Sequence, residues 1–322
     1  MPKVSVIIPV FRVEKYIERC VRCLFNQTLD NIEFIFVDDC TPDKSIEIIS
    51  QLLEEYKLYI VEKNWTIRIE RMSTNSGQAA VRQHGIQLAT GEYIIHCDSD
   101  DWVHHDMYRA MYEKAVSDDV DVVVCDYNIH DGNDTLQVVK GCHSIGIVKF
   151  RESTLLKKDS WALWNKLFNR RVFTKEIQYP ICNMGEDMVI CIQLLFNCRN
   201  MSYIQNALYF YFNNNSSITN KRDSSIHIRN FEHLKNNTDI LINYLYDKEI
   251  RHKKWIINGL QYNATITLLN IIHNDKKFRE IWMNTYPGAN LLYIFNPYIN
   301  IMHRFKCCLA LIGLYPLRKD RL

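Results

Sequence analysis

The 322-residue sequence contains few glycines and prolines, little charge excess and no long apolar run. With 10 Gly and 7 Pro, it has no low-complexity linker and no collagen-like repeat. Its formal net charge of +2 argues against a nucleic-acid-binding protein, because such proteins usually carry a strong basic excess. No window reaches the roughly 20 apolar residues that a membrane-spanning helix needs. These absences leave a globular protein, whose length predicts about two compact units.

The eleven cysteines are an odd number spread along the chain, which indicates a reduced, cytoplasmic setting. The apolar run 4–11 is short and interrupted by Pro9, and no small-residue cleavage site follows it. We therefore interpret it as a buried strand and not as a secretion signal. Cys20 and Cys23 form a C-x-x-C pair without a second pair or a nearby histidine set. We expect these two thiols to pack as small apolar groups on a helix.

Strand-like and helix-like patterns alternate over the first 126 residues. Continuous apolar runs, typical of strands buried on both faces, occupy 4–10, 32–37, 67–72, 93–97 and 120–125. Helical spacing of apolar residues separates them at 14–28, 76–89 and 105–116, and Thr41-Pro42 is interpreted as the cap and first residue of another helix. This alternation predicts an α/β fold with a mostly parallel sheet flanked by helices.

The pattern changes twice along the chain, which predicts three regions. Regular alternation covers 1–126, a less regular stretch covers 127–220, and mainly helical periodicity covers 221–322. Within the middle stretch a helix is expected to begin near Glu186.

The C-terminal tail combines a short apolar stretch with basic residues. The apolar residues are 307–315, and the basic ones around them are Arg304, Lys306, Arg318, Lys319 and Arg321. Such a segment could lie at a membrane surface beside anionic head groups. It could equally be an ordinary C-terminal helix packed on the core, and the sequence leaves both interpretations open.

Carboxylates gather where two of the predicted strands end. Asp38 and Asp39 follow one strand, and Asp98, Asp100 and Asp101 follow another. In an open parallel sheet ligands bind beyond the carboxyl ends of the strands. Neighbouring carboxylates repel one another unless a cation or a donor group satisfies them, so Asp98-Ser99-Asp100 predicts a site for a divalent cation and a diphosphate. Neither a dinucleotide-binding glycine motif nor a P-loop occurs.

Five motifs in order resemble those of family 2 glycosyltransferases, which have the GT-A fold. They are VSVIIPVF at 4–11, VDDCTPD at 37–43, NSGQAAVRQHG at 75–85, GEYIIHCDSDD at 91–101 and GED at 185–187. The resemblance covers about residues 3–215. It implies a Rossmann-like, GT-A type sheet, with 1–126 as the half that binds a nucleotide-sugar and 127–220 as the half that binds the acceptor.

The resemblance also implies residues that bind the donor. Asp39 corresponds to the carboxylate that reads the uracil edge, and Asp98 to the residue nearest the ribose and donor sugar. Asp100, with Asp98, corresponds to the ligand of Mn²⁺ or Mg²⁺. The other positions expected to bind the nucleotide-sugar are Pro9, Val10, Phe11, Glu14, Asn75, Gly77, Arg82 and Ser99.

A further set of positions corresponds to the acceptor side of the reaction. Asp187 matches the catalytic base, with Glu186 beside it, and Trp164 and Lys166 belong to a stretch placed near the acceptor. The sequence departs from the family pattern at Arg12, where Asn is frequent, and at Thr41-Pro42, where Ser is usual. Neither departure removes a carboxylate, so they put only the details of the nucleoside loop in question.

The predicted activity is inverting, metal-dependent transfer of a hexose or N-acetylhexosamine from a nucleotide-sugar, expected to be a UDP-sugar. The acceptor is expected to be a glycan or a lipid-linked sugar in polysaccharide biosynthesis, at the cytoplasmic face of a membrane. A non-catalytic nucleotide-sugar-binding module is one alternative. A sugar-phosphate nucleotidyltransferase is another, although it would need a glycine-rich basic loop where this chain has Pro9-Val10-Phe11-Arg12. Three histidines, His96, His104 and His105, flank the D-x-D motif. One of them could touch the metal or the phosphates, but the favoured interpretation is that they are ordinary surface or core histidines.

Overall fold

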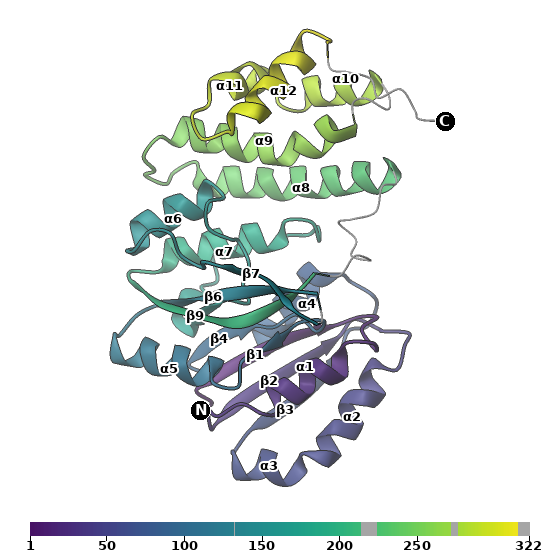
Figure 1. Ribbon diagram of the computed structural model, residues 1–322, viewed down its shortest axis with the longest axis vertical. Helices are drawn as coiled ribbons and strands as arrows, with labels where there is room; N and C mark the ends of the chain where they lie inside the picture. Colours follow the sequence, from purple (N-terminus) through teal and green to yellow (C-terminus); the bar gives the residue numbers. More distant parts are fainter. Residues whose placement is uncertain (132, 214–223, 272–275, 315–322) are drawn as a thin grey trace. The chain divides into compact units, whose positions relative to one another are not determined.

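The computed structural model describes residues 1–131, 133–213, 224–271 and 276–314 (Figure 1). The chain divides into two compact units, Met1–Asn215 and Ser216–Leu322. The first unit is mixed α/β and the second is helical, as the sequence predicts.

The first unit alternates strands and helices up to residue 117 and continues with longer, less regular connections. Its strands are β1 (Val4–Val10), β2 (Ile32–Asp38), β3 (Thr66–Arg71), β4 (Tyr93–His96), β5 (Trp102–Val103), β6 (Val122–His130), β7 (Thr135–Val139), β8 (Lys166–Asn169) and β9 (Met201–Phe212). Its helices are α1 (Ile17–Leu24), α2 (Ser45–Glu55), α3 (Lys57–Glu62), α4 (Gln78–Leu88), α5 (Met107–Ser117), α6 (Ile147–Leu155) and α7 (Glu186–Asn197).

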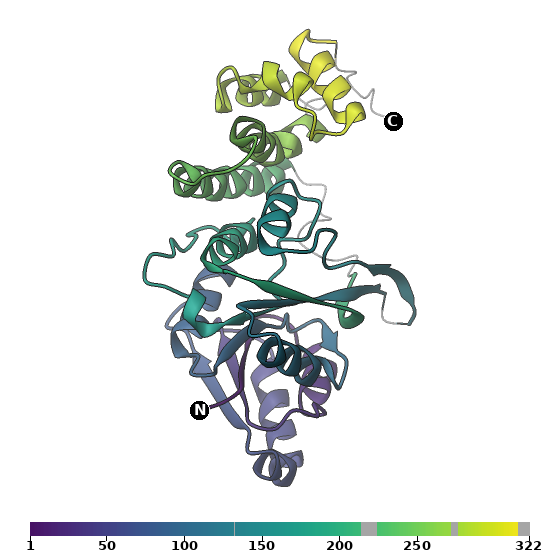
Figure 2. The same ribbon diagram turned by 90° about the vertical axis from the view of Figure 1, so that its left-hand side faces the viewer.

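These strands form one sheet in the order β3-β2-β1-β4-β8-β6-β9-β5, with β7 paired to β6. The first four strands in this order are parallel, as predicted. β8 runs antiparallel to both β4 and β6, so the sheet is mixed beyond β4. Figure 2 shows the β6–β7 hairpin extending beyond the other strands.

Alternate residues of β1 pack into different cores, which explains the continuous apolar runs. Val6 and Ile8 belong to the core that includes residues of α1, α2 and α5. Ile7 lies on the opposite face with Val81 and Ile86 of α4. A strand buried on both faces cannot show an alternating apolar and polar pattern.

One predicted helix start is wrong. α2 begins at Ser45, with Lys44 as its cap, and not at Thr41-Pro42. The Thr41 hydroxyl instead accepts the backbone N–H of Arg12 and donates to Asp43, at 2.8 and 2.7 Å. Thr41 therefore joins the loops after β1 and β2 and does not cap a helix.

The second unit has its own hydrophobic core. Trp282, Tyr293 and Leu268 are completely or almost completely buried in it. Of the predicted tail, residues 315–322 lie outside the described residues, while Phe305 and Ile312 are exposed. No helix in the described ranges is both long and apolar enough to cross a membrane. The helices of this unit are α8 (Ser224–Leu245), α9 (Lys253–Ile271), α10 (Lys276–Thr285), α11 (Ala289–Phe295) and α12 (Ile301–Leu311).

Candidate functional site

The parallel part of the sheet brings the sequence motifs together at one edge. In the β1–β2 register Val10 lies opposite Asp38, and in the β1–β4 register Ile7 lies opposite His96. The loops that follow β1, β2 and β4 therefore leave the sheet at the same end. These loops carry Phe11, Asp39 and Asp98, which lie far apart in the sequence.

The carboxylate of Asp39 organises the loop that precedes α4. It accepts the backbone N–H groups of Ser76 and Gly77 at 2.6 and 2.9 Å, and the Asn75 amide at 3.1 Å. Gly77 has a φ of +81° and a ψ of 164°, a conformation that is essentially confined to glycine. The side chains predicted to read and enclose a nucleobase are thus connected to one another.

The stretch after β1 is partly open to solvent. Pro9 and Val10 end the strand, whereas the Phe11 ring is 38% exposed. Glu14 accepts the backbone N–H of Lys44 at 3.0 Å. Arg12, one of the departures from the family pattern, has a φ of +55°.

The turn at Asp98–Asp101 is anchored by hydrogen bonds to residues of β9. The Asp98 N–H donates to the Tyr209 hydroxyl, which donates to the Asp101 carboxylate at 2.6 Å. Asp101 also accepts the N–H of Phe212 at 2.7 Å. Through these bonds Asp101, which is 1% exposed, anchors the turn from within the protein and is not itself open to a ligand.

Asp98 and Asp100 present carboxylates at this turn, with Ser99 buried between them. Burial, reinforced by the charge of Asp98, raises the pKa of Asp100 to about 6. Two neighbouring carboxylates with hard oxygen donors suit a divalent cation such as Mg²⁺ or Mn²⁺. The donor set therefore fits the predicted metal.

Arg82 connects the donor side of the site with α7. Its guanidinium, 3% exposed, donates to Asp98 at 2.7 Å and to Glu186 at 2.8 Å. One guanidinium nitrogen of Arg82 and the second carboxylate oxygen of Glu186 are buried without a hydrogen-bond partner. Burial raises the pKa of Glu186 to about 7, although the Arg82 charge opposes this rise. Glu186 is thus an inward-facing residue of an ion-pair network.

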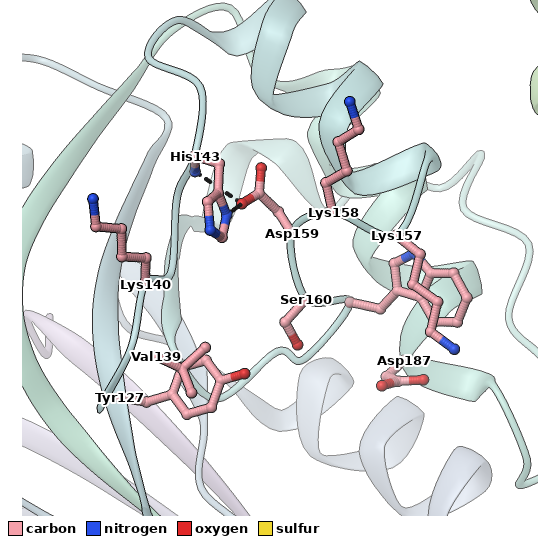
Figure 3. Close-up of a pocket in the computed structure, with 10 residues that line it drawn as sticks. Tyr127, Val139, Lys140, His143, Lys157, Lys158, Asp159, Ser160 and Asp187 are labelled. Carbon is pink, nitrogen blue, oxygen red and sulfur yellow. Dashed lines mark hydrogen bonds and ion pairs between the residues drawn. The ribbon is translucent and has the colours of Figure 1, made fainter. Parts of the chain in front are cut away.

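Asp187 lies in the first turn of α7, directly after Gly185 and Glu186. Gly185 precedes the helix with a φ of +77°, and the helix dipole favours an ionised carboxylate in this turn. Burial nevertheless raises the pKa of Asp187. The carboxylate faces a pocket of about 300 Å³, where the Lys157 side chain extends towards it (Figure 3).

Two residues expected at the acceptor are turned inwards. Lys166 is fully buried, and its ammonium donates three hydrogen bonds of 2.8–2.9 Å to oxygens of Ser160, Ala162 and Asn165. The expectation that Lys166 contacts an acceptor phosphate or solvent is therefore wrong for this structure, because its donors already stabilise the loop before β8. Trp164 is 7% exposed, with its ring stacked on Tyr209 at a centroid distance of 4.2 Å.

The sequence left Trp161 open as a side chain that stacks on a sugar face or as a buried aromatic, and it assigned no role to the other residues around Asp187 in this pocket. Trp161 lines it and donates its indole N–H to the Thr154 carbonyl at 2.8 Å. The rest of the lining comes from Tyr127 of β6, from the loop that follows α6, and from Val139, Lys140 and His143 at and after the end of β7. Apart from the aromatic residue Trp161, the sequence offered only the polar cluster at 157–160, which carries no family motif and no periodicity.

The histidines near the metal turn have other surroundings. His96 is 2% exposed, and burial lowers its pKa well below the ordinary value. His104, His105 and Asp106 lie close enough together to hold an ion, but Asp106 already accepts hydrogen bonds from Thr28 and Arg109 at 2.6 Å. This group lies outside the D-x-D turn.

The structure places the strand-end carboxylates, the D-x-D turn and the acidic start of α7 in one unit, in the order that the resemblance to family 2 glycosyltransferases implies. The family model described as "Glycosyl transferase family 2" matches residues 5–184, and the chain belongs to this family. Asp187 lies three residues beyond the matched segment.

Individual relatives agree with this assignment. The chain is 28% identical over 222 residues to glycosyltransferase GlyA of Streptococcus pneumoniae, covering 65% of this chain and 30% of GlyA. It spans less than two thirds of the length of the curated relatives it matches.

Two solved structures share the fold. S. aureus TarS 1–349 in complex with UDP-GlcNAc matches with a TM-score of 0.71 and 18% identity, covering 97% of this chain and 89% of that protein. The mannosyltransferase PcManGT of Pyrobaculum calidifontis, in complex with GDP-Man and Mn²⁺, matches with a TM-score of 0.56 and 14% identity, covering 99% and 88%. The predicted GT-A type fold is confirmed by these similarities.

Proposed function

We propose that this protein transfers a hexose or N-acetylhexosamine from a nucleotide-sugar to a glycan or lipid-linked acceptor, with inversion at the anomeric carbon. The observation that carries the proposal is the Arg82 bridge. It connects Asp98, on the donor side, to the helix start where Asp187 faces an open pocket.

In this proposal the donor lies across the carboxyl ends of β1, β2 and β4. Asp39 accepts an N–H of the base, as the uracil edge provides, and the loop of Asn75 and Gly77 encloses it. The UDP-GlcNAc and GDP-Man complexes of the two structural relatives support a nucleoside diphosphate-sugar as donor.

Asp98 and Asp100 would hold a divalent cation. The cation, when bound, supplies charge neutralisation for the diphosphate leaving group. The Mn²⁺ in the PcManGT complex supports a metal of this kind. Asp101 and Tyr209 keep the turn in place from the protein side.

Asp187 acts as the base. The oxygen of the acceptor hydroxyl attacks the anomeric carbon while the bond between this carbon and the diphosphate oxygen breaks. The proton of the hydroxyl passes to the Asp187 carboxylate, and the nucleoside diphosphate leaves. A positioned base of this kind contributes about 10²–10⁴-fold to the rate. Burial raises the pKa of Asp187 and so makes its carboxylate a stronger base, as general base catalysis near neutral pH requires.

We also propose that the enzyme acts at the cytoplasmic membrane face. The support is the exposed apolar side chains of Met302, Phe305 and Ile312 in and after α12, together with Arg304 and Lys306 of the same helix. Such a surface suits reversible contact with anionic lipids, where a lipid-linked acceptor would be found.

Donor binding is tested by thermal unfolding with UDP-, GDP-, CMP- and dTDP-sugars, each with and without Mn²⁺. A ligand at about 100 times its dissociation constant stabilises the folded state by about 2.7 kcal/mol. We expect stabilisation by a UDP-sugar that requires the metal. Equal stabilisation with and without Mn²⁺ would contradict the role given to Asp98 and Asp100.

The base is tested with Asp187→Asn. We expect transfer to fall by about 10²–10⁴-fold while donor affinity is retained, because the substitution removes the proton acceptor and keeps the shape. Glu176→Gln, which changes an exposed carboxyl group outside the site, is the matched control. An Asp187→Asn enzyme that transfers normally would show that another group takes the proton.

A further inference from the structure

The pocket beside Asp187 has a charge pattern that sugar transfer alone does not require. Its lining includes Lys140, Lys157 and Lys158 but only two carboxylates. Asp159, one of these, is 1% exposed and accepts both the backbone N–H and the ring Nδ1 of His143, at 2.9 and 2.7 Å. Among the described residues that line the pocket, Asp187 is therefore the one carboxylate available to three ammonium groups.

The three lysines come from two separate segments of the chain. Lys140 follows β7 directly, and Lys157 and Lys158 follow α6. Figure 3 shows the side chains of Lys140 and Lys158 on either side of the His143–Asp159 pair, with Lys157 extending towards Asp187. None of the three forms an ion pair with a carboxylate within the described ranges of the chain.

Lys157 is held in an unusual backbone conformation. Its φ is +57°, in the left-handed region where glycine is usual after a helix. Its ammonium lies 4.9 Å from the centroid of the Trp161 ring, so a cation and an aromatic face are presented together. The left-handed conformation closes the end of α6, because the N–H groups of Lys157 and Lys158 donate to the carbonyls of Thr154 and Ser153 at 3.0 and 2.9 Å.

The aromatic wall suits a polyhydroxy chain. The Trp161 ring is fixed by the hydrogen bond from its indole N–H to Thr154, and Tyr127 lines the same pocket. Flat aromatic faces pack against the C–H faces of sugars and alditols, while ammonium groups pair with anionic oxygens.

We propose that this pocket binds an acceptor carrying a phosphate or carboxylate group close to the hydroxyl that receives the sugar. The inference rests on the proposed function and names the acceptor class. Lys140 and Lys158 bind the anionic group, Trp161 packs against the chain, and Asp187 faces the reacting hydroxyl.

The test is isothermal titration of the 322-residue protein with three oligomers of equal length. They are a glycerol-phosphate oligomer, an oligogalacturonate and a neutral maltooligosaccharide. We expect at least one anionic oligomer to bind at least tenfold more tightly than the neutral one at low salt, and the difference to shrink as salt is added. The oligomer that binds distinguishes phosphate from carboxylate.

Variants test whether the lysines are responsible. We expect Lys140→Gln/Lys158→Gln to weaken binding of the anionic oligomer at least fivefold and to leave the melting temperature unchanged, since both residues are exposed. Lys149→Gln/Lys175→Gln, which changes two exposed lysines that do not line the pocket, is the matched control and should bind normally.

Two results would overturn the inference: equal affinity for neutral and anionic oligomers, or unchanged affinity in the Lys140/Lys158 variant. The donor panel described above is run on the same preparation. If a nucleotide-sugar stabilises the protein but anionic and neutral oligomers bind equally well, the inference about the acceptor is rejected and the proposed transfer reaction is not. Anionic preference without stabilisation by any donor supports the pocket and rejects the transfer reaction.

Discussion

At the residue scale, Lys166 shows how a charged side chain can serve the site without touching a ligand. Its ammonium is completely buried, and its three hydrogen bonds stabilise the loop that carries Ser160 and Ala162. Burial lowers the pKa of Lys166, which is the cost of holding a cation there.

We expect Lys166→Met to lower the free energy of unfolding by about 1–3 kcal/mol, because it leaves buried acceptors unpaired. Urea denaturation measures this effect, with exposed Lys175→Met as the control. Donor affinity should stay the same while the acceptor KM rises, because the loop lines the pocket that we propose for the acceptor. A variant with normal stability would contradict the structural role.

The raised pKa of Glu186 predicts how the stability of the folded state changes with pH. The Arg82 guanidinium contacts Asp98 and Glu186, with Asp187 next in the chain, so one cation cannot neutralise all three carboxylates. The pKa of Glu186 is raised from 4.5 to about 7 in the folded protein. The folded state therefore holds this proton more tightly, and its contribution to stability is fully present below pH 4.5 and lost as pH rises to about 7.

Glu186→Gln should remove this contribution and keep the hydrogen bond from Arg82. We expect the fall in unfolding free energy between pH 4.5 and pH 7 to become shallower, by at most about 1.4 kcal/mol per pH unit. Urea denaturation at three pH values in this range measures it, and Glu176→Gln should keep the wild-type slope. An unchanged slope in Glu186→Gln would show that this carboxyl group titrates normally.

At the element scale, the loop before α4 depends on a conformation that glycine provides. A Cβ on Gly77 would lie 2.4 Å from the Asn183 side chain, and the backbone there is essentially glycine-only. Gly85, on the same helix, allows close packing instead, since a Cβ there would lie 2.4 Å from Ile7 of β1.

We expect Gly77→Ala to destabilise the fold by about 1–3 kcal/mol and to weaken donor binding, because the loop can no longer hold its bonds to Asp39. Gly146→Ala is the matched control. Gly146 also has a positive φ, of +99°, but nothing lies within 4 Å of its Cβ position. Melting temperature and donor titration separate the two effects: only Gly77→Ala should change donor affinity.

The parallel strands were predictable from the sequence and the pocket beside Asp187 was not, for a physical reason. The runs in β1, β2 and β4 are apolar because both faces are buried, and the carboxylates follow because strand ends form the site. The antiparallel strand β8 is only four residues long and has no periodicity to detect. The pocket of Tyr127, Trp161 and Asp187 combines three distant segments, and only the folded chain brings them together.

At the scale of the whole molecule, each unit has its own core. The first contains every residue assigned to donor, metal and base, and the second packs around Trp282 and Tyr293. A unit with an independent core can fold alone.

We therefore expect a chain that ends at Asn215 to fold and to bind the donor with a dissociation constant within about threefold of the value for the 322-residue chain. A tenfold change in Kd would correspond to a loss of about 1.4 kcal/mol of binding free energy. Thermal unfolding with the donor panel measures both properties. Loss of donor binding in a folded, shortened protein would show that the second unit contributes to the site.

The hydrogen bonds of Asp39 have a consequence for the choice of base. An ionised carboxylate has about four lone-pair positions. Three of those on Asp39 are occupied, by Asn75, Ser76 and Gly77. One position remains, and it can accept a single N–H. Uracil, thymine and guanine each carry a ring N–H that fits this vacancy, whereas cytosine presents a bare ring nitrogen whose electron pair would face the negative charge.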